Sequence, residues 1–168
     1  MTTALTYRLP DACWRLEISA QVVAELRRHV QTSRASHESV GQLYARDVTG
    51  ECVRLECSTL LKPRLASWAR VTFDTSQANQ ERARLFKEGW HCVGIWHTHP
   101  EPMPSPSPDD RQLAREHALA ARGYLDGLVF AILGNGPLPQ SLRVWIDDGT
   151  ELRMTKQIAN SPKPSRQA

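Results

Sequence analysis

The sequence is organised around the stretch GIWHTHP, residues 94–100, which continues through a proline-rich segment to Ser107-Pro108-Asp109-Asp110. An apolar run ends here in two histidines, His97 and His99. Residues i and i+2 of an extended strand project to the same side, so both imidazoles are expected to face one point beyond the strand end. Asp110 offers a carboxylate from the element that follows. Two histidines and one carboxylate form a three-ligand set for a catalytic zinc whose fourth position is left to water.

Each part of this pattern has a simpler explanation when it is taken alone. Two neighbouring histidines can be solvated loop residues, and Ser107 followed by Pro108 and acids is typical of a helix start. Prolines stand at every second position from 100 to 108 and predict a stiff, extended segment. That segment is compatible with a polyproline connector or a ligand for a partner domain. A stiff spacer also lowers the entropy lost in holding Asp110 opposite the imidazoles, which favours a preorganised metal site.

The apolar pattern on either side predicts strands mixed with helices. Strands are expected at 13–18, 38–45, 52–61, 71–73, 91–96 and 128–133, with a closing hairpin from 141–146 and 152–157. One helix is expected from Ser19 and fades near residue 33, and a second covers 77–88 with Asp74 or Ser76 as its N-cap. The inward side of the second helix is expected to carry Ala78, Leu85 and Phe86. This order indicates an α/β fold, a three-layer α/β/α sandwich with helices on the faces of a mixed, curved sheet.

The third helix is expected to begin at Ser107 and to place Asp110 at the head of its inward face. Leu113, Ala114, His117 and Ala121 share that face by helical periodicity. His117 therefore has two interpretations, a group that supports Asp110 or an ordinary half-buried helix histidine.

Length and composition set limits on the class of protein. At 168 residues one domain is expected, over 1–158, followed by a disordered tail at 159–168. A net charge of +3 is too weak to argue for nucleic-acid binding. The chain has no long apolar run for a membrane span and no signal pattern, which indicates a cytoplasmic protein. Its four cysteines lack CxxC spacing, so they are read as reduced core thiols and do not indicate a zinc finger. Cys92 as a nucleophile is also rejected, because it lies inside a strand without an argued base.

The full motif is His-x-His, seven residues, serine, two residues and aspartate, which His97, His99, Ser107 and Asp110 satisfy. Glu38 precedes it, ahead of a Gly-x-Leu strand. This pattern resembles the JAMM (MPN-plus, or JAB-domain) family of zinc metalloproteases. It resembles especially the short bacterial members, the deconjugating isopeptidases encoded beside ubiquitin-like E1 and E2 enzymes in anti-phage (CBASS-like) operons.

The resemblance implies a fold similar to that of cytidine deaminases and assigns a role to each motif residue. His97, His99 and Asp110 would hold one Zn²⁺ per chain. Glu38 would act as the general base for the bound water. Ser107 would hydrogen-bond the water or the developing oxyanion, although the same hydroxyl is also expected to cap a helix.

The resemblance also implies an activity and partners. We expect hydrolysis of an amide or isopeptide bond after the C-terminus of a ubiquitin-like protein, with E1- and E2-like enzymes as further partners and with no nucleic acid or membrane. Alternatives are release of a sulfur-carrier protein's tail in biosynthesis and a non-catalytic scaffold of the same fold. A zinc nucleobase deaminase would also need a Pro-Cys-x-x-Cys motif, which is missing from the sequence, so this class is excluded.

Overall fold

The computed structural model of the chain describes residues 2–33, 36–62 and 74–159. Within these residues it has ten strands and three helices. Their order is β1 (Leu5–Arg8), β2 (Arg15–Ile18), α1 (Ala20–Arg27), β3 (Val40–Ala45), β4 (Cys52–Leu55), β5 (Cys57–Ser58), α2 (Thr75–Lys87), β6 (His91–Thr98), α3 (Pro108–Ala121), β7 (Leu128–Leu133), β8 (Leu142–Asp147), β9 (Leu152–Met154) and β10 (Lys156–Ile158).

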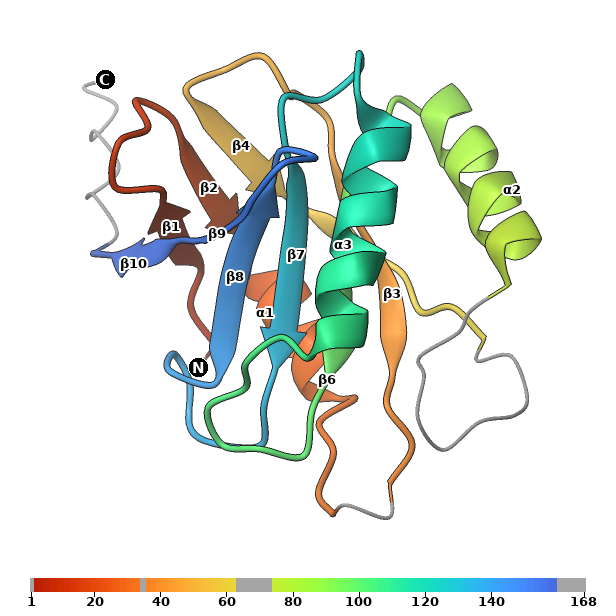
Figure 1. Cartoon of the computed structure of the whole chain (residues 1–168). Helices are drawn as coiled ribbons and strands as arrows, with labels where there is room; N and C mark the ends of the chain where they lie inside the picture. Colours follow the sequence, from red (N-terminus) through yellow and green to blue (C-terminus); the bar gives the residue numbers. More distant parts are fainter. Residues whose placement is uncertain (1, 34–35, 63–73, 160–168) are drawn as a thin grey trace, which may run out of the picture.

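The strands form two mixed sheets (Figure 1). The larger has six strands in the order β5-β3-β6-β7-β8-β9, and the smaller has four in the order β10-β1-β2-β4. At the centre of the larger sheet β6 and β7 run parallel, and α3 makes the crossover that a parallel pair requires. The predicted α/β class with a mixed sheet is confirmed, whereas the second sheet was not predicted.

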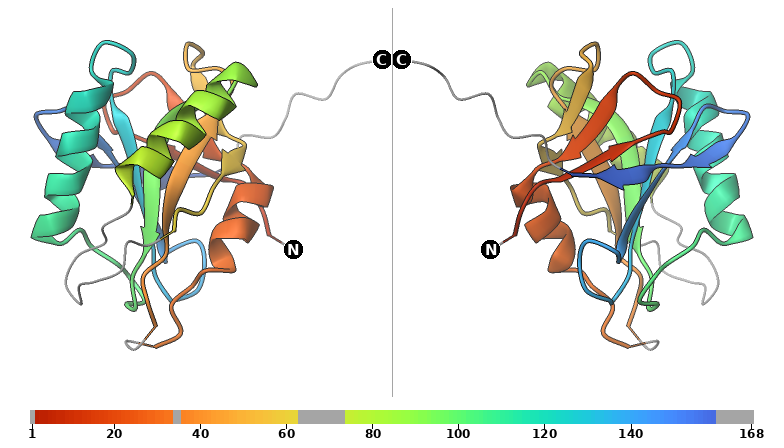
Figure 2. Two further views of the ribbon diagram at one scale, coloured as in Figure 1. Left: turned by 90° about the vertical axis from the view of Figure 1, so that its right-hand side faces the viewer. Right: turned by 90° about the vertical axis from the view of Figure 1, so that its left-hand side faces the viewer.

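The larger sheet is the middle layer of the molecule (Figures 1 and 2). α2 and α3 cover one of its faces, and α1 lies with the smaller sheet on the other. β7 is buried on both sides, as its unbroken apolar sequence predicts. Phe130 and Ile132 pack with Ala114 and Ala118 of α3, and Val129 and Ala131 pack into the core that includes α1 and the smaller sheet.

Two segments that were predicted as single strands are divided between the sheets. In the predicted strand 52–61, β4 pairs parallel with β2 of the smaller sheet and β5 pairs antiparallel with β3 of the larger one. The segment 152–157 is divided in the same way into β9 and β10. Thr155 fixes the second division, because its N–H and its hydroxyl both donate to the carbonyl of Val144, at 3.0 and 2.7 Å. Alternation of side chains continues through both divisions, so the sequence pattern does not mark them.

The structure also differs from the sequence-based expectations for individual strands and helices. β1 was not predicted, yet it lies inside the smaller sheet between β10 and β2. α1 ends at Arg27 rather than near residue 33. Phe86 was expected to face inward, but 63% of it is exposed, because Ala78 and Leu85 already fill the inward side of α2. Asp74, not Ser76, caps that helix.

Some expectations fall on residues outside the described ones. The short strand expected at 71–73 and the tail from residue 160 onward belong to this group. The predicted domain boundaries therefore stay a prediction. Of the helices in the described ranges, none is sufficiently long and apolar to cross a membrane.

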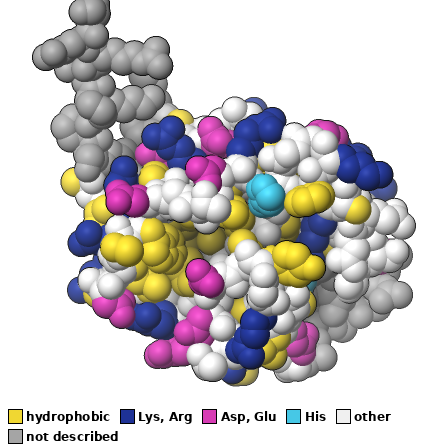
Figure 3. All heavy atoms as spheres, turned by 90° about the horizontal axis from the view of Figure 1, so that it is seen from above, with side chains coloured by type: hydrophobic (Ala, Val, Ile, Leu, Met, Phe, Trp, Pro, Cys, Tyr) yellow, Lys and Arg dark blue, Asp and Glu magenta, His cyan; other side chains and the backbone are white. Residues whose placement is uncertain are grey.

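The upper end of the molecule in Figure 1 is seen face-on in Figure 3. Acidic and basic side chains are interspersed there with hydrophobic ones. The N-terminal end of α3, which carries Asp110, lies at the opposite, lower end. The cluster of histidines and aspartate described next is therefore at the end away from the face in Figure 3.

Candidate metal centre

The two histidines of the motif lie where β6 ends beside β7. His97 is within the strand, paired with Val40 of β3 and Ile132 of β7, and is 1% exposed. His99 follows the strand, and its backbone N–H donates to the carbonyl of Leu133 at 2.9 Å. The parallel ladder thus holds the backbone up to His99. Both rings project to one side, and their Nε2 atoms are 3.0 Å apart. The expectation drawn from the i, i+2 spacing is confirmed.

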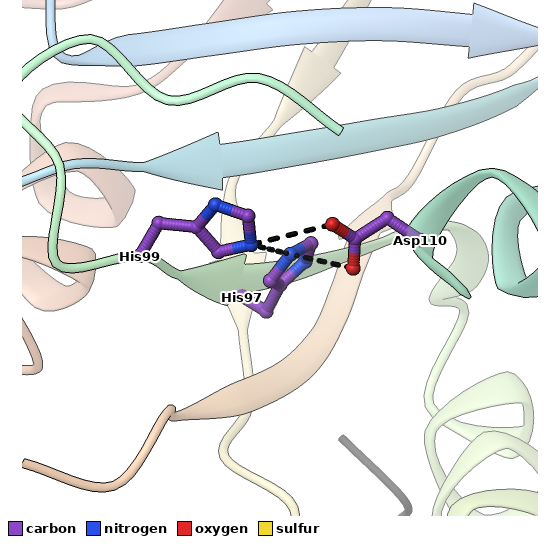
Figure 4. Close-up of side chains that lie close together, drawn as sticks. All are labelled: His97, His99 and Asp110. Atoms are coloured by element: carbon purple, nitrogen blue, oxygen red, sulfur yellow. Dashed lines mark hydrogen bonds and ion pairs between the residues drawn. The ribbon is translucent and has the colours of Figure 1, made fainter. Parts of the chain in front are cut away.

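Asp110 reaches the same point from the first turn of α3 (Figure 4). Ser107 caps the helix, because its hydroxyl accepts from the N–H of Asp110 at 3.1 Å. The carboxylate of Asp110 accepts in return from the N–H of Ser107 at 2.7 Å. This reciprocal capping box fixes the rotamer of Asp110 and turns the carboxylate toward the imidazoles.

The two imidazoles and the carboxylate form a compact triangle of three ligand groups, in which each histidine contacts a different oxygen of Asp110. His97 Nε2 is 3.1 Å from Asp110 Oδ1, and His99 Nε2 is 3.3 Å from Asp110 Oδ2. The third side is the 3.0 Å between the two Nε2 atoms. A tetrahedral zinc with bonds of about 2.0–2.1 Å needs ligand atoms about 3.3 Å apart. The three ligand groups are therefore close enough to share one such ion, which leaves its fourth position for water. Among the described residues, this is the one group of three or more His, Cys, Asp or Glu side chains that lie close enough to share a metal ion.

Each member of the triangle changes the electrostatics of the others. Burial alone would raise the pKa of Asp110, but hydrogen bonds from His97 and His99 hold it far below its usual value. Burial alone would lower the pKa of His99, but the hydrogen bond and charge of Asp110, together with the charge of Glu38, raise it. A buried carboxylate needs compensating positive charge, which a bound divalent cation would supply.

Glu38 shares this environment, although it lies outside the triangle. It is half-buried two residues before β3, and its charge interacts with His97, His99 and Asp110. Burial raises the pKa of Glu38, and the two histidines oppose the rise. The structure thus brings the predicted base and the predicted ligands to one site, from segments about sixty residues apart in the sequence.

Comparison with known proteins agrees with this geometry. The profile of the family described as prokaryotic homologs of the JAB domain matches residues 19–146, which include all five predicted site residues. The chain belongs to this family. The JAB family includes zinc-dependent isopeptidases. A search of curated proteins found no significant match.

Two solved structures share the fold of this chain. A solution structure of a protein from Desulfitobacterium hafniense aligns with a TM-score of 0.61 at 18% identity, and covers 82% of this chain and 87% of that one. A protein from Salinibacter ruber aligns with a TM-score of 0.51 at 17% identity, over 90% of this chain and 93% of that one. At such identities the likeness concerns the fold alone.

Two other residues of the JAB domain behave as the simpler hypotheses predict. His117 is half-buried and faces α2, where Arg82 Nη2 lies 3.3 Å from its Nδ1. Burial and the charge of Arg82 lower the pKa of His117 to about 4, so His117 is a neutral acceptor at neutral pH.

Burial raises the pKa of the Cys92 thiol, which agrees with the rejection of Cys92 as a nucleophile.

The proline-rich loop of the JAB domain is held by contacts that were not predicted from the sequence. It bends at residues 100–103, so it is not extended throughout. Arg143 donates to the carbonyl of Pro104 at 3.0 Å, and Asn135 donates from its side chain to the carbonyl of Pro100 at 2.8 Å. Glu101 was also missed: its Oε2 lies 3.3 Å from Nδ1 of His99. A carboxylate two residues after a candidate ligand histidine was the available signal.

Proposed function

We propose that this JAB domain is a zinc-dependent peptidase that hydrolyses an amide or isopeptide bond after the C-terminus of a ubiquitin-like protein. One observation carries the proposal. The imidazoles of His97 and His99 and the two carboxylate oxygens of Asp110 make contacts of 3.0–3.3 Å, with the raised-pKa carboxylate of Glu38 in the same site. A scaffold of the same fold needs neither the ligand triangle nor the base, so the intact set favours an enzyme.

The bound zinc would supply a water whose pKa is about 7, and hence hydroxide at neutral pH. The protein's own residues would handle the protons. Glu38 accepts a proton from the water at its carboxylate and donates it later to the leaving amine. Its half-buried position suits this role, because burial raises the pKa toward the range in which a carboxyl both takes up and releases a proton.

Ser107 can serve as helix cap and as oxyanion partner at the same time. The cap uses an acceptor lone pair of its hydroxyl, which receives the N–H of Asp110. A hydroxyl also has one proton to donate, which the cap does not use. That proton can stabilise the negative charge that develops on the carbonyl oxygen of the substrate. The two roles that compete in the sequence are therefore compatible in the structure.

The substrate class is supported by family membership, since JAB proteins include isopeptidases. We propose deconjugation or processing of a ubiquitin-like protein in a bacterial anti-phage system, in the cytoplasm and alongside E1- and E2-like enzymes. Processing of a sulfur-carrier protein is the alternative biosynthetic role. Genes for E1- and E2-like enzymes next to this one would favour defence, and genes for cysteine or cofactor biosynthesis would favour the alternative.

The proposed function is tested by cleavage of a fusion made through the C-terminal glycine of a ubiquitin-like protein. The parent should cleave it, a chelator should stop cleavage and added zinc should restore it. Glu38→Gln should retain zinc and lose cleavage, whereas the control Glu56→Gln, at an exposed position, should cleave like the parent. Cleavage by Glu38→Gln at the parent rate would rule out the assigned base.

A further inference from the structure

Glu101 contacts the imidazole of His99 at the ring nitrogen that does not face His97 and Asp110. Its carboxylate lies 3.3 Å from Nδ1 of His99, while Nε2 of the same ring faces His97 and Asp110. A neutral imidazole has one N–H and one lone pair, so an acceptor at Nδ1 keeps the proton there. The lone pair of Nε2 is then directed at the triangle. Metal-binding histidines commonly depend on such a partner for their tautomer and ring orientation.

The backbone at Glu101 is held in place by the loop that follows β7. The N–H of Asn135 donates to the carbonyl of Glu101 at 2.9 Å, and the Asn135 side chain holds the preceding carbonyl of Pro100. Gly134 makes this approach possible: a Cβ at Gly134 would lie 2.1 Å from the carbonyl oxygen of Glu101. A Cβ at Gly136 would lie 2.6 Å from the carbonyl oxygen of Pro102. The loop after β6 and the loop after β7 therefore pack backbone against backbone, and there is no room for a side chain at Gly134 or Gly136.

We propose that Glu101 is a positioning residue that accepts a hydrogen bond from Nδ1–H of His99 and so presents Nε2 to the metal. Gly134 and Asn135 set the place of Glu101 in turn. The proposal rests on the proposed metal function, but it concerns metal binding and not the substrate. The side chain of Glu101 is 55% exposed, so its effect comes from directed hydrogen bonding and not from burial of its charge.

The test is the affinity of the metal-free full chain for Zn²⁺, measured by competition with a chromophoric chelator. Glu101→Ala should lower the affinity about 10- to 100-fold, which is typical for loss of such a partner. Glu101→Gln keeps an acceptor oxygen and should stay close to the parent. Glu51→Ala removes an exposed glutamate elsewhere and should change nothing. A Glu101→Ala variant that binds zinc as tightly as the parent would overturn the proposal.

Gly134→Ala provides a second test of the proposal. It is independent of Glu101→Ala because it removes no side chain from the site. The added methyl group must displace the carbonyl of Glu101, so zinc affinity should fall in the same direction as in Glu101→Ala. If both act through Glu101, the double variant should lose little more than Glu101→Ala alone. Fully additive losses would show that Gly134 acts by another route. The absorption spectrum of the Co²⁺-substituted protein should also change in Glu101→Ala and remain parent-like in Glu101→Gln.

These results separate the two proposals. A parent that binds zinc but cleaves no ubiquitin-like fusion would contradict the proposed function and leave the role of Glu101 supported by the affinities. Equal affinities in an active enzyme would contradict the role of Glu101 alone. A parent with no affinity for zinc would contradict both.

Discussion

The hydroxyl of Thr98 accepts a hydrogen bond from the backbone N–H of Ser39 at 2.9 Å. The N–H of Thr98 donates to the carbonyl of Ser39 at 3.0 Å, so the two residues are joined twice. Thr98 lies between the two ligand histidines and is fully buried, and Ser39 follows the proposed base, Glu38. This pair therefore couples the position of the base to that of the ligands.

Thr98→Val should keep the shape of the side chain and lose this link. The N–H of Ser39 would lack its partner, which should cost about 1–3 kcal/mol of unfolding free energy. We expect zinc binding to persist and kcat to fall, because Glu38 is less well placed while the ligands remain. Thr98→Ser keeps the hydroxyl, so its unfolding free energy and its kcat should be close to those of the parent. If Thr98→Val and Thr98→Ser have equal kcat, the link does not position Glu38.

Ser107→Ala should affect stability and rate together, because one hydroxyl serves the cap and the oxyanion. Loss of the N-cap should lower the unfolding free energy by about 1 kcal/mol. Loss of the donor should lower kcat by about 10²- to 10³-fold. Ser107→Asp restores a capping acceptor without a donor, so denaturant unfolding should return toward the parent while cleavage stays slow. Unchanged kcat in Ser107→Ala would exclude the oxyanion role.

His117 should make the protein less stable in acid. Its pKa is about 4 in the folded chain against an ordinary value of 6.5, so the unfolded chain binds more protons between these limits. Its contribution is fully present above pH 6.5 and is lost as the pH falls toward 4. The loss is at most about 3.5 kcal/mol, at roughly 1.4 kcal/mol for each pKa unit.

His117→Gln provides the comparison for this pH effect. Glutamine can accept from Arg82 without titrating, so the variant should lose less stability than the parent between pH 7 and pH 4.5. Urea unfolding of both metal-free proteins measures the difference. Identical losses in the two proteins would show that His117 does not titrate as described.

Gly41→Ala should strongly destabilise the fold next to the site. A Cβ at Gly41 would lie 1.8 Å from the carbonyl oxygen of Thr59, which accepts from the indole N–H of Trp96 at 3.0 Å. Overpacking of this kind costs about 1–3 kcal/mol or more. Gly50→Ala is the control, since its nearest contact would be an ordinary 3.4 Å. Thermal unfolding followed by tryptophan fluorescence compares the two, and equal midpoints would contradict the packing described at Gly41.

The features that were predicted from the sequence are those that local chemistry determines. The spacing of His97 and His99 fixes a shared face, and Ser107 with Asp110 fixes a helix start, so both halves of the site follow from short-range rules. Their meeting depends on the packing of α3 on the larger sheet. Placing Glu38 there required the family motif, because no local pattern joins it to β6. The strand divisions after Leu55 and at Thr155 depend on which sheet has a free edge, which side-chain alternation does not encode.

The contact of Glu101 with His99 shows the same limit inside the site. The side chain is close in sequence, but its place is set by Gly134 and Asn135, more than thirty residues further along the chain. The packing of Gly134 and Asn135 against the backbone of Glu101 arises only in the folded chain. Proline spacing predicted a stiff loop, and the bends at 100–103 come from these contacts instead.

The metal content of the purified chain tests the central claim most directly. Protein prepared without chelator should contain about one zinc per chain, as expected for a three-ligand catalytic site. Asp110→Ala should lose the zinc, whereas Asp109→Ala, which changes the exposed neighbour in the same helical turn, should retain it. A folded parent without stoichiometric zinc, or an Asp110→Ala variant with the full amount, would contradict the account.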